Sequence, residues 1–292
     1  MGERYDRIAN QAREIYGWSL DVVAAEEVVY QELMELLIEP LDSVQHQWDD
    51  SENRSAVMLL ISRLFNDLQA AHHLALLGLT EQSIHGLRDA VECMLLIRLF
   101  DAEPNLALRY LKYAKEYSAG NCVAILKQKK IDPPEYQLYT MLSTLAHPNV
   151  FGAVAHVSEE RLPEGILRIY HFGGFKNALW IGQELRNLLG CLGLALVAVL
   201  PPIYAPVMHD FKGWASRVLE AVDKLPALGM DVQTQPLEMS QLPADSRVAL
   251  RKLQEKMSFR FRPLPKLDKM MWIHPEAGIK RGSHKVSEEA DG

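Results

Sequence analysis

The chain has 292 residues, of which 48% are hydrophobic, so it is long enough to bury a sizeable core. Its net charge of -7 is unevenly distributed, because the stretch 256–285 holds eight Lys or Arg against two acidic residues, and residues 1–255 therefore carry about -10 once the three acidic residues of 286–292 are counted. An acidic body repels nucleic acid, which disfavours RNA or DNA as an obligate ligand. Three cysteines without a CxxC pair, and no apolar signal peptide, indicate a cytoplasmic protein without a disulfide framework.

The first forty residues predict two helices. Gly17-Trp18-Ser19 is expected to separate them, and Pro40 is expected to end the second one. We interpret residues 1–48 as an arm or lid.

A pair of long helices, from about 55 to 77 and from 81 to 100, is the central prediction. Apolar residues recur at helical spacing along the first helix, and Gly78 supplies its stop. Thr80 is expected to cap the second helix. Because the second helix is apolar around most of its circumference, we expect it to be central and largely buried.

The next part of the chain predicts shorter elements. Helices are expected over 104–118 and 133–146, the latter because a proline in the first turn favours a helix start. Between 150 and 172 the period changes to two short β-prone runs, 150–154 and 166–170, which predict a small β-hairpin.

Two further helices, over 175–200 and 208–224, complete a helical bundle of residues 49–224. Residues 225–292 are expected to form a Pro-containing linker, a short helix at 245–257 and an irregular basic tail. The fold class is therefore mainly all-α.

The uncharged stretch 187–208 raises the question of a membrane anchor. A spanning helix needs about 20 apolar residues, whereas Pro201-Pro202 stops this one and Gly190 and Gly193 weaken it. We therefore favour a buried core helix and expect no stable membrane insertion.

Polar residues interrupt the central helix pair. His85, Arg88 and Glu92 share one stripe of the second helix, and Asp67 lies among apolar residues of the first. Because unpaired buried charges are costly, we expect Asp67 or Glu92 to pair with Arg88 across the helix interface. Such pairing does not exclude function, since clusters of this kind also mark sites.

A second candidate lies at the end of the helix over 133–146. A helix carboxyl terminus favours the imidazolium form, so His147 is a candidate proton donor or acceptor near neutral pH. The alternative is a capping histidine that bonds the last free carbonyls. Ser143 and Asn149 flank His147 and are candidate binding residues.

Neither a metal site nor a cofactor site is predicted. His72 and His73 are adjacent and point to different helix faces, and the HExxH, Walker and dinucleotide-binding patterns do not occur. In the basic tail, Arg260 and Arg262 alternate with Phe259 and Phe261, and Lys266 follows them; these three basic residues are candidates for binding single-stranded nucleic acid. The alternative is a solvated tail.

Three segments together resemble a bacterial group of HEPN-like helical proteins: Arg63-Leu64-Phe65-Asn66-Asp67, Leu87-Arg88-Asp89-Ala90-Val91-Glu92 and Leu142-Ser143-Thr144-Leu145-Ala146-His147-Pro148. The resemblance covers about half of the chain. It implies a helical bundle in which Asp67, Arg88, Glu92 and His147 meet, and it implies dimerisation. HEPN relatives include toxins, abortive-infection proteins and RNases of phage defence.

The chain departs from the nuclease pattern, because an Arg-x4-6-His motif needs arginine at 140–142, where Thr140-Met141-Leu142 stand. Our first hypothesis is therefore a module that acts through protein or small-ligand contacts in a bacterial phage-defence or toxin-type system, as a homo-oligomer such as a dimer. The second is an atypical metal-independent RNase using Arg88 and His147, with Glu92 orienting Arg88. The third is a membrane-acting effector that uses 187–208.

Overall fold

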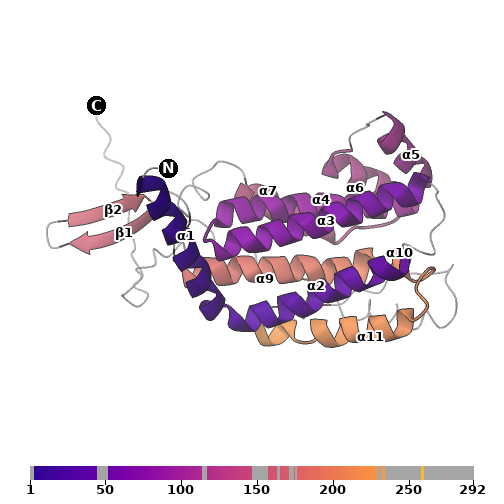
Figure 1. Cartoon of the computed structure of the whole chain (residues 1–292). Coiled ribbons are helices and arrows are strands. Elements are labelled where there is room, and N and C mark those ends of the chain that lie inside the picture. The colour runs from indigo at the N-terminus through magenta and orange to yellow at the C-terminus, as the bar shows by residue number, and fades with distance from the viewer. Residues whose placement is uncertain are drawn as a thin grey trace, which may run out of the picture.

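The computed structural model describes residues 3–44, 52–113, 117–146, 157–162, 165–170, 174, 176–228, 230, 232–233 and 258–259. The molecule is mainly α-helical, and its long helices lie in two layers (Figure 1). The helices are α1 (Glu3–Val22), α2 (Ala24–Val44), α3 (Glu52–Leu76), α4 (Thr80–Ala102), α5 (Pro104–Tyr113), α6 (Ala119–Gln128), α7 (Glu135–Ala146), α9 (Ala178–Leu194), α10 (Pro201–Tyr204) and α11 (Phe211–Val222). One layer holds α3, α4 and α7, and the other holds α2, α9 and α11.

The predicted boundaries of the first two helices are wrong. Gly17-Trp18-Ser19 lies inside α1, and the break comes at Val23, which is still bonded to Ser19 through its backbone amide. Pro40 does not end α2, because the helix continues to Val44. Leu33 and Leu37 of α2 are fully buried, so this helix contributes to the core.

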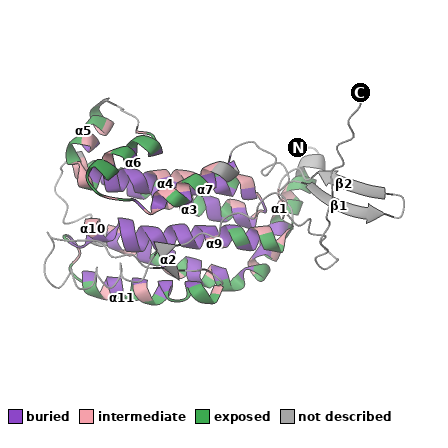
Figure 2. Ribbon diagram, turned by 180° about the vertical axis from the view of Figure 1, so that it is seen from behind, coloured by how far each residue is buried: buried purple, intermediate pink, exposed green. Residues whose placement is uncertain are grey.

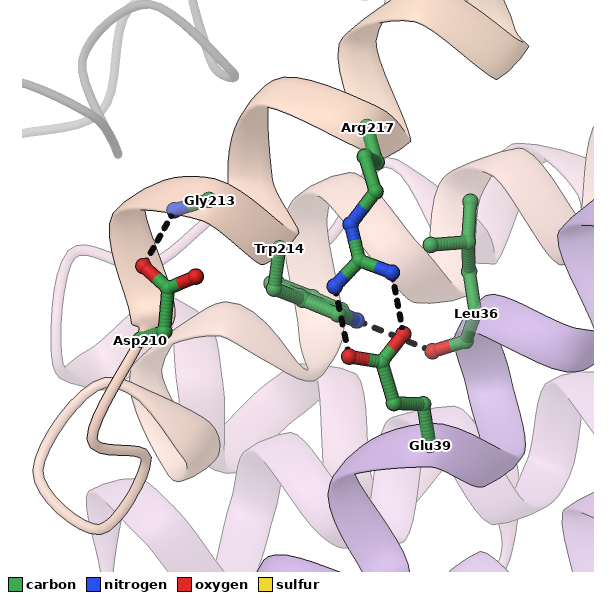
Figure 3. Close-up of polar contacts among 6 residues, drawn as sticks. All are labelled: Leu36, Glu39, Asp210, Gly213, Trp214 and Arg217. Carbon is green, nitrogen blue, oxygen red and sulfur yellow. Dashed lines mark hydrogen bonds and ion pairs between the residues drawn. The ribbon is translucent and has the colours of Figure 1, made fainter.

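A side chain from α11 compensates for Pro40. Proline has no backbone N–H, so the carbonyl of Leu36, four residues earlier, lacks its usual α-helical donor. The indole Nε1 of Trp214 donates to this carbonyl at 2.9 Å, within the buried interface of α2 and α11 (Figure 3). Arg217 forms a two-pronged ion pair with Glu39 at the exposed edge of the same interface.

The central helix pair is confirmed as α3 and α4. Gly78 ends α3 with a positive φ of 71°, which glycine adopts without steric cost. The expected Thr80 cap is wrong, because Leu79 is the N-cap, no side chain caps α4, and Thr80 is its first residue. Gly174 packs against this turn, where an added Cβ would overlap the carbonyl oxygen of Leu77.

The helix expected over 104–118 is shorter, and the sequence interpretation missed the one after it. α5 ends at Tyr113, and Ser118 begins α6 by accepting a hydrogen bond from the amide of Asn121 at 3.3 Å. α7 lies within the helix predicted over 133–146.

Two strands, β1 (Val157–Leu162) and β2 (Gly165–Tyr170), pair in antiparallel fashion. They lie beside α1 at one end of the bundle and point away from it (Figure 1). The β-prone run 166–170 falls within β2, whereas 150–154 lies outside the described residues. A second, two-residue pair joins β3 (Val232–Gln233) to β4 (Ser258–Phe259). The helix expected at 245–257 also lies outside the described residues.

α9 lies at the centre of the core. It contacts α2, α3 and α4, and almost its whole length from Ile181 onward is buried (Figure 2). It continues as a π-helical segment, Ala195–Val199, up to the prolines that begin α10. No helix among the described residues is long and apolar enough to cross a membrane.

Candidate functional site

The polar residues predicted on the central pair lie where α3 and α4 approach closely. Gly86 permits this approach, since a Cβ at that position would lie 3.3 Å from the carbonyl oxygen of Asp67 and 3.2 Å from the Cβ of Ala71. Around this crossing lies a partly exposed set of charged residues that we call the polar strip. Its members are Arg63, Asp67, Arg88, Asp89 and Glu92.

Arg63 joins the two helices of the polar strip. Its Nε lies 3.4 Å from Oδ2 of Asp67, one turn away on α3, and its Nη2 lies 3.9 Å from Oδ2 of Asp89 on α4. Burial and the neighbouring Asp89 carboxylate raise the pKa of Asp67, although Arg63 opposes the shift. The thiol of Cys93 also donates to Asp67, at 3.8 Å. Sequence reasoning did not select Arg63 as a site residue, although its (i, i+4) spacing from Asp67 was visible.

The expected pairing of Arg88 is correct in its partner but wrong in its geometry. Nη2 of Arg88 lies 3.6 Å from Oε1 of Glu92 on the same helix, so the pair does not cross the interface. Asp67 pairs with Arg63 instead. Both side chains of the Arg88 pair are about one-third exposed, and His85 is exposed on the same helix.

α7 packs along α4 and is held there by a buried ion pair. Nε of Arg98 donates to Oε1 of Glu135 at 2.5 Å, and its Nη2 donates to Oε2 of Glu135 at 3.2 Å and to the carbonyl of Ala198 at 3.1 Å. Glu135 is fully buried, and Arg98 is 8% exposed. A planar guanidinium that satisfies both carboxylate oxygens offsets part of the cost of burying the two charges.

Several predicted site residues cannot be placed beside the polar strip. Ser143 lies on α7, and its Oγ is buried without a hydrogen-bond partner. His147 and Asn149 follow the end of α7 and lie outside the described residues. The tail candidates, which are Arg260, Arg262 and Lys266, also lie outside them.

A second polar cluster, missed by sequence reasoning, crosses the core between α2, α3 and α9. Nε2 of His72 lies 2.7 Å from Oε2 of Glu27, and the His72 ring stacks on Tyr30 with centroids 3.8 Å apart. Burial alone would raise the pKa of Glu27, but its hydrogen bonds to His72 and Gln31 outweigh burial and lower it.

The same cluster continues into α9 through the residue next to Glu27. Oε1 of Glu26 lies 3.4 Å from Nη2 of Arg186, and the Asn187 amide donates to Oε1 of Glu184 at 3.3 Å. Glu184 is 2% exposed, and its Oε2 has no partner. Burial raises the pKa of Glu184 to about 8. In the sequence, this cluster could have been found from the polar residues Glu184, Arg186 and Asn187, which interrupt the otherwise apolar helix α9.

Neither cluster has the composition of a metal centre. Within the described part of the chain, no group of three or more His, Cys, Asp or Glu could hold a metal ion. All three cysteines are buried, and burial raises the pKa of the Cys93 and Cys122 thiols to about 12, so these are poor thiolate ligands or nucleophiles.

Comparison with known proteins gave no relatives from which a function could be transferred. No family model matches the chain, and neither a curated protein nor a solved structure matches it. Function is therefore inferred from the residues and their geometry.

Proposed function

We propose that the chain is a HEPN-like helical module that acts in the cytoplasm by binding a protein or a small ligand, without cleaving RNA. The observation that carries the proposal is the polar strip. Its charges pair mainly with one another, and its side chains are between 23% and 52% exposed, so they are accessible to a partner. A rigid helix pair holds such side chains in fixed positions, which suits recognition of a partner.

The resemblance of three segments to HEPN-like proteins supports the same proposal. The first two segments lie on α3 and α4 and residues 142–146 of the third lie at the end of α7, and α4 packs against both α3 and α7. By this resemblance we place the chain in a bacterial phage-defence or toxin-type system, as a homo-oligomer such as a dimer. The acidic body and the absence of arginine from 140–142 support binding over RNA cleavage.

One observation favours the RNase alternative. The ion pair of Arg98 and Glu135 fixes where α7 begins along α4. Because α4 ends four residues after Arg98, α7 can pack along α4 only by running toward the N-terminus of α4. Arg88 and Ala146 each lie about 15 Å along their helices from this ion pair. The end of α7, directly before His147, is therefore level with Arg88.

An RNA cleavage assay with the full-length chain separates the two functions. Structured and single-stranded RNA is incubated with the wild type, with His147→Ala and with His85→Ala, the latter as a control at an exposed histidine of α4. We expect intact RNA in all three samples. Specific cleavage by the wild type and by His85→Ala that is lost in His147→Ala would establish the RNase and exclude the binding module.

A further inference from the structure

Two hydrogen-bond donors between α4 and α7 have no acceptor among the described residues. Nε of Arg88 and Oγ of Ser143 are both buried atoms without a partner. Within the described part of the chain, the contact shown for the Arg88 guanidinium is the long one with Glu92, at 3.6 Å, which exceeds a normal hydrogen bond. Buried polar groups are usually satisfied, so two unpaired donors on neighbouring helices mark a place where an acceptor can bind.

The register of the two helices brings these donors to one flank of the α4–α7 contact. Arg88 lies ten residues before Arg98, and Ser143 lies eight residues after Glu135. These steps correspond to about 15 Å and about 12 Å along the helices, and each rotates the residue by about 80° away from the ion pair. Because the helices run in opposite directions, the two rotations lead to the same side (Figure 1).

The donor chemistry specifies the class of ligand. A guanidinium N–H and a hydroxyl can both donate to the same group, and the guanidinium adds a positive charge. The carboxylate of Glu92, which is 32% exposed, already approaches this cation and is the natural competitor for it. An acceptor with negative charge would satisfy both donors at once.

We propose that Arg88 and Ser143 bind an anionic group, a phosphate or a carboxylate, on a small ligand, and that Glu92 occupies Arg88 in its absence. This inference rests on the proposed binding function and identifies the ligand chemistry of that site. It requires no cleavage step and no residue beyond α4 and α7.

Isothermal titration calorimetry of the full-length chain tests the proposal with two probes, inorganic phosphate and acetate, against chloride at equal ionic strength. We expect saturable binding of at least one probe and a matching rise in melting temperature, because a ligand that binds only the folded state stabilises it. The probe that saturates at the lower concentration identifies the preferred group. Saturation by neither probe would overturn the proposal.

Four variants make the test specific. Arg88→Met and Ser143→Ala should weaken binding, Arg88→Met by about tenfold or more, because it removes a charge-assisted hydrogen bond. Glu92→Gln should strengthen binding, because the competing charge is removed. Arg109→Met removes one positive charge from the exposed surface of α5, outside the polar strip, and should bind like the wild type.

The outcomes of the two experiments are distinguishable. Binding that survives Arg88→Met, or that is lost equally in Arg109→Met, would refute the anion site while leaving a non-cleaving module intact. RNA cleavage would refute the proposed function whatever the titration shows. Should Arg88→Met fail to fold, the opposite changes expected for Ser143→Ala and Glu92→Gln still decide the question.

Discussion

The link between Trp214 and Pro40 predicts that two residues on different helices contribute to stability in a coupled way. Trp214→Phe keeps most of the buried aromatic surface but removes the indole N–H that donates to the Leu36 carbonyl (Figure 3). An unpaired buried acceptor costs about 1–3 kcal/mol, and the smaller ring leaves a cavity. We expect a total loss of about 2–4 kcal/mol in the free energy of unfolding.

Pro40→Ala provides the decisive background for this substitution. Alanine restores a backbone N–H four residues after Leu36, so the carbonyl keeps a donor when the indole is removed. A carbonyl has two lone pairs, so the new amide need not displace Trp214. The loss caused by Trp214→Phe should therefore be smaller by about 1–2 kcal/mol in the Pro40→Ala background.

Urea unfolding of the wild type, Trp214→Phe, Pro40→Ala and the double variant, monitored by far-ultraviolet circular dichroism, measures this coupling. Trp18→Phe serves as the control, because Trp18 lies on α1 and its cost should be the same in both backgrounds. Arg217→Ala should cost only about 0.2–1 kcal/mol, since the ion pair with Glu39 is half exposed. Equal costs of Trp214→Phe with and without Pro40 would refute the reasoning.

Three further predictions concern the stability of the fold. The pKa of Glu184 is raised from 4.5 to about 8, so the unfolded state loses its proton first, and the stability of the wild type should fall as pH rises from about 4.5 to 8. Glu184→Gln should remove this fall. Urea unfolding across that pH range measures it, and the same pH dependence in wild type and variant would contradict the prediction. Arg98→Met should lower the free energy of unfolding by about 3–5 kcal/mol, because it leaves the buried Glu135 unpaired. The double variant Arg98→Met with Glu135→Leu should lose much less. Chemical denaturation measures both losses, and equal losses would argue against a buried charge effect. Gly174→Ala should lower the melting temperature because its Cβ overlaps a backbone carbonyl, while Gly120→Ala in open space on α6 should leave it unchanged or raise it; a harmless Gly174→Ala would show that the turn can move.

The sequence predicted the long helices because their apolar periodicity is local information. It placed α3 and α4 within a few residues of their bounds, and the positive φ of Gly78 is the physical basis of the stop that it predicted. Pro40 misled the prediction because the donor that replaces its missing N–H comes from a residue 178 positions away from Leu36. Helix-ending rules describe the isolated chain and cannot include such a partner.

The polar clusters were harder to predict for the same reason. Arg63 and Asp67 are one turn apart, so their contact could have been read from spacing, but His72 and Glu27 are 45 positions apart. The sequence analysis named Asp67 or Glu92 as the partner of Arg88, and Glu92 is the partner, but the assumption that buried charges pair across interfaces assigned it the wrong geometry. Because the side chains of Arg88 and Glu92 are partly exposed to solvent, their charges need no partner across the helix interface.

The buried ion pair of Arg98 and Glu135 connects these observations to the proposed anion site. Such pairs add little stability compared with apolar residues of the same size, but they penalise every register in which the charges do not meet. A slip of α7 by one residue would rotate Ser143 by about 100° and carry it away from the flank where Arg88 lies. The apolar contacts of α7 tolerate small shifts more readily than a two-pronged contact at 2.5 and 3.2 Å does. The register of α7, and with it the proposed position of Ser143 on the same flank as Arg88, therefore depends on two residues that lie about 12–15 Å along the helices from the site.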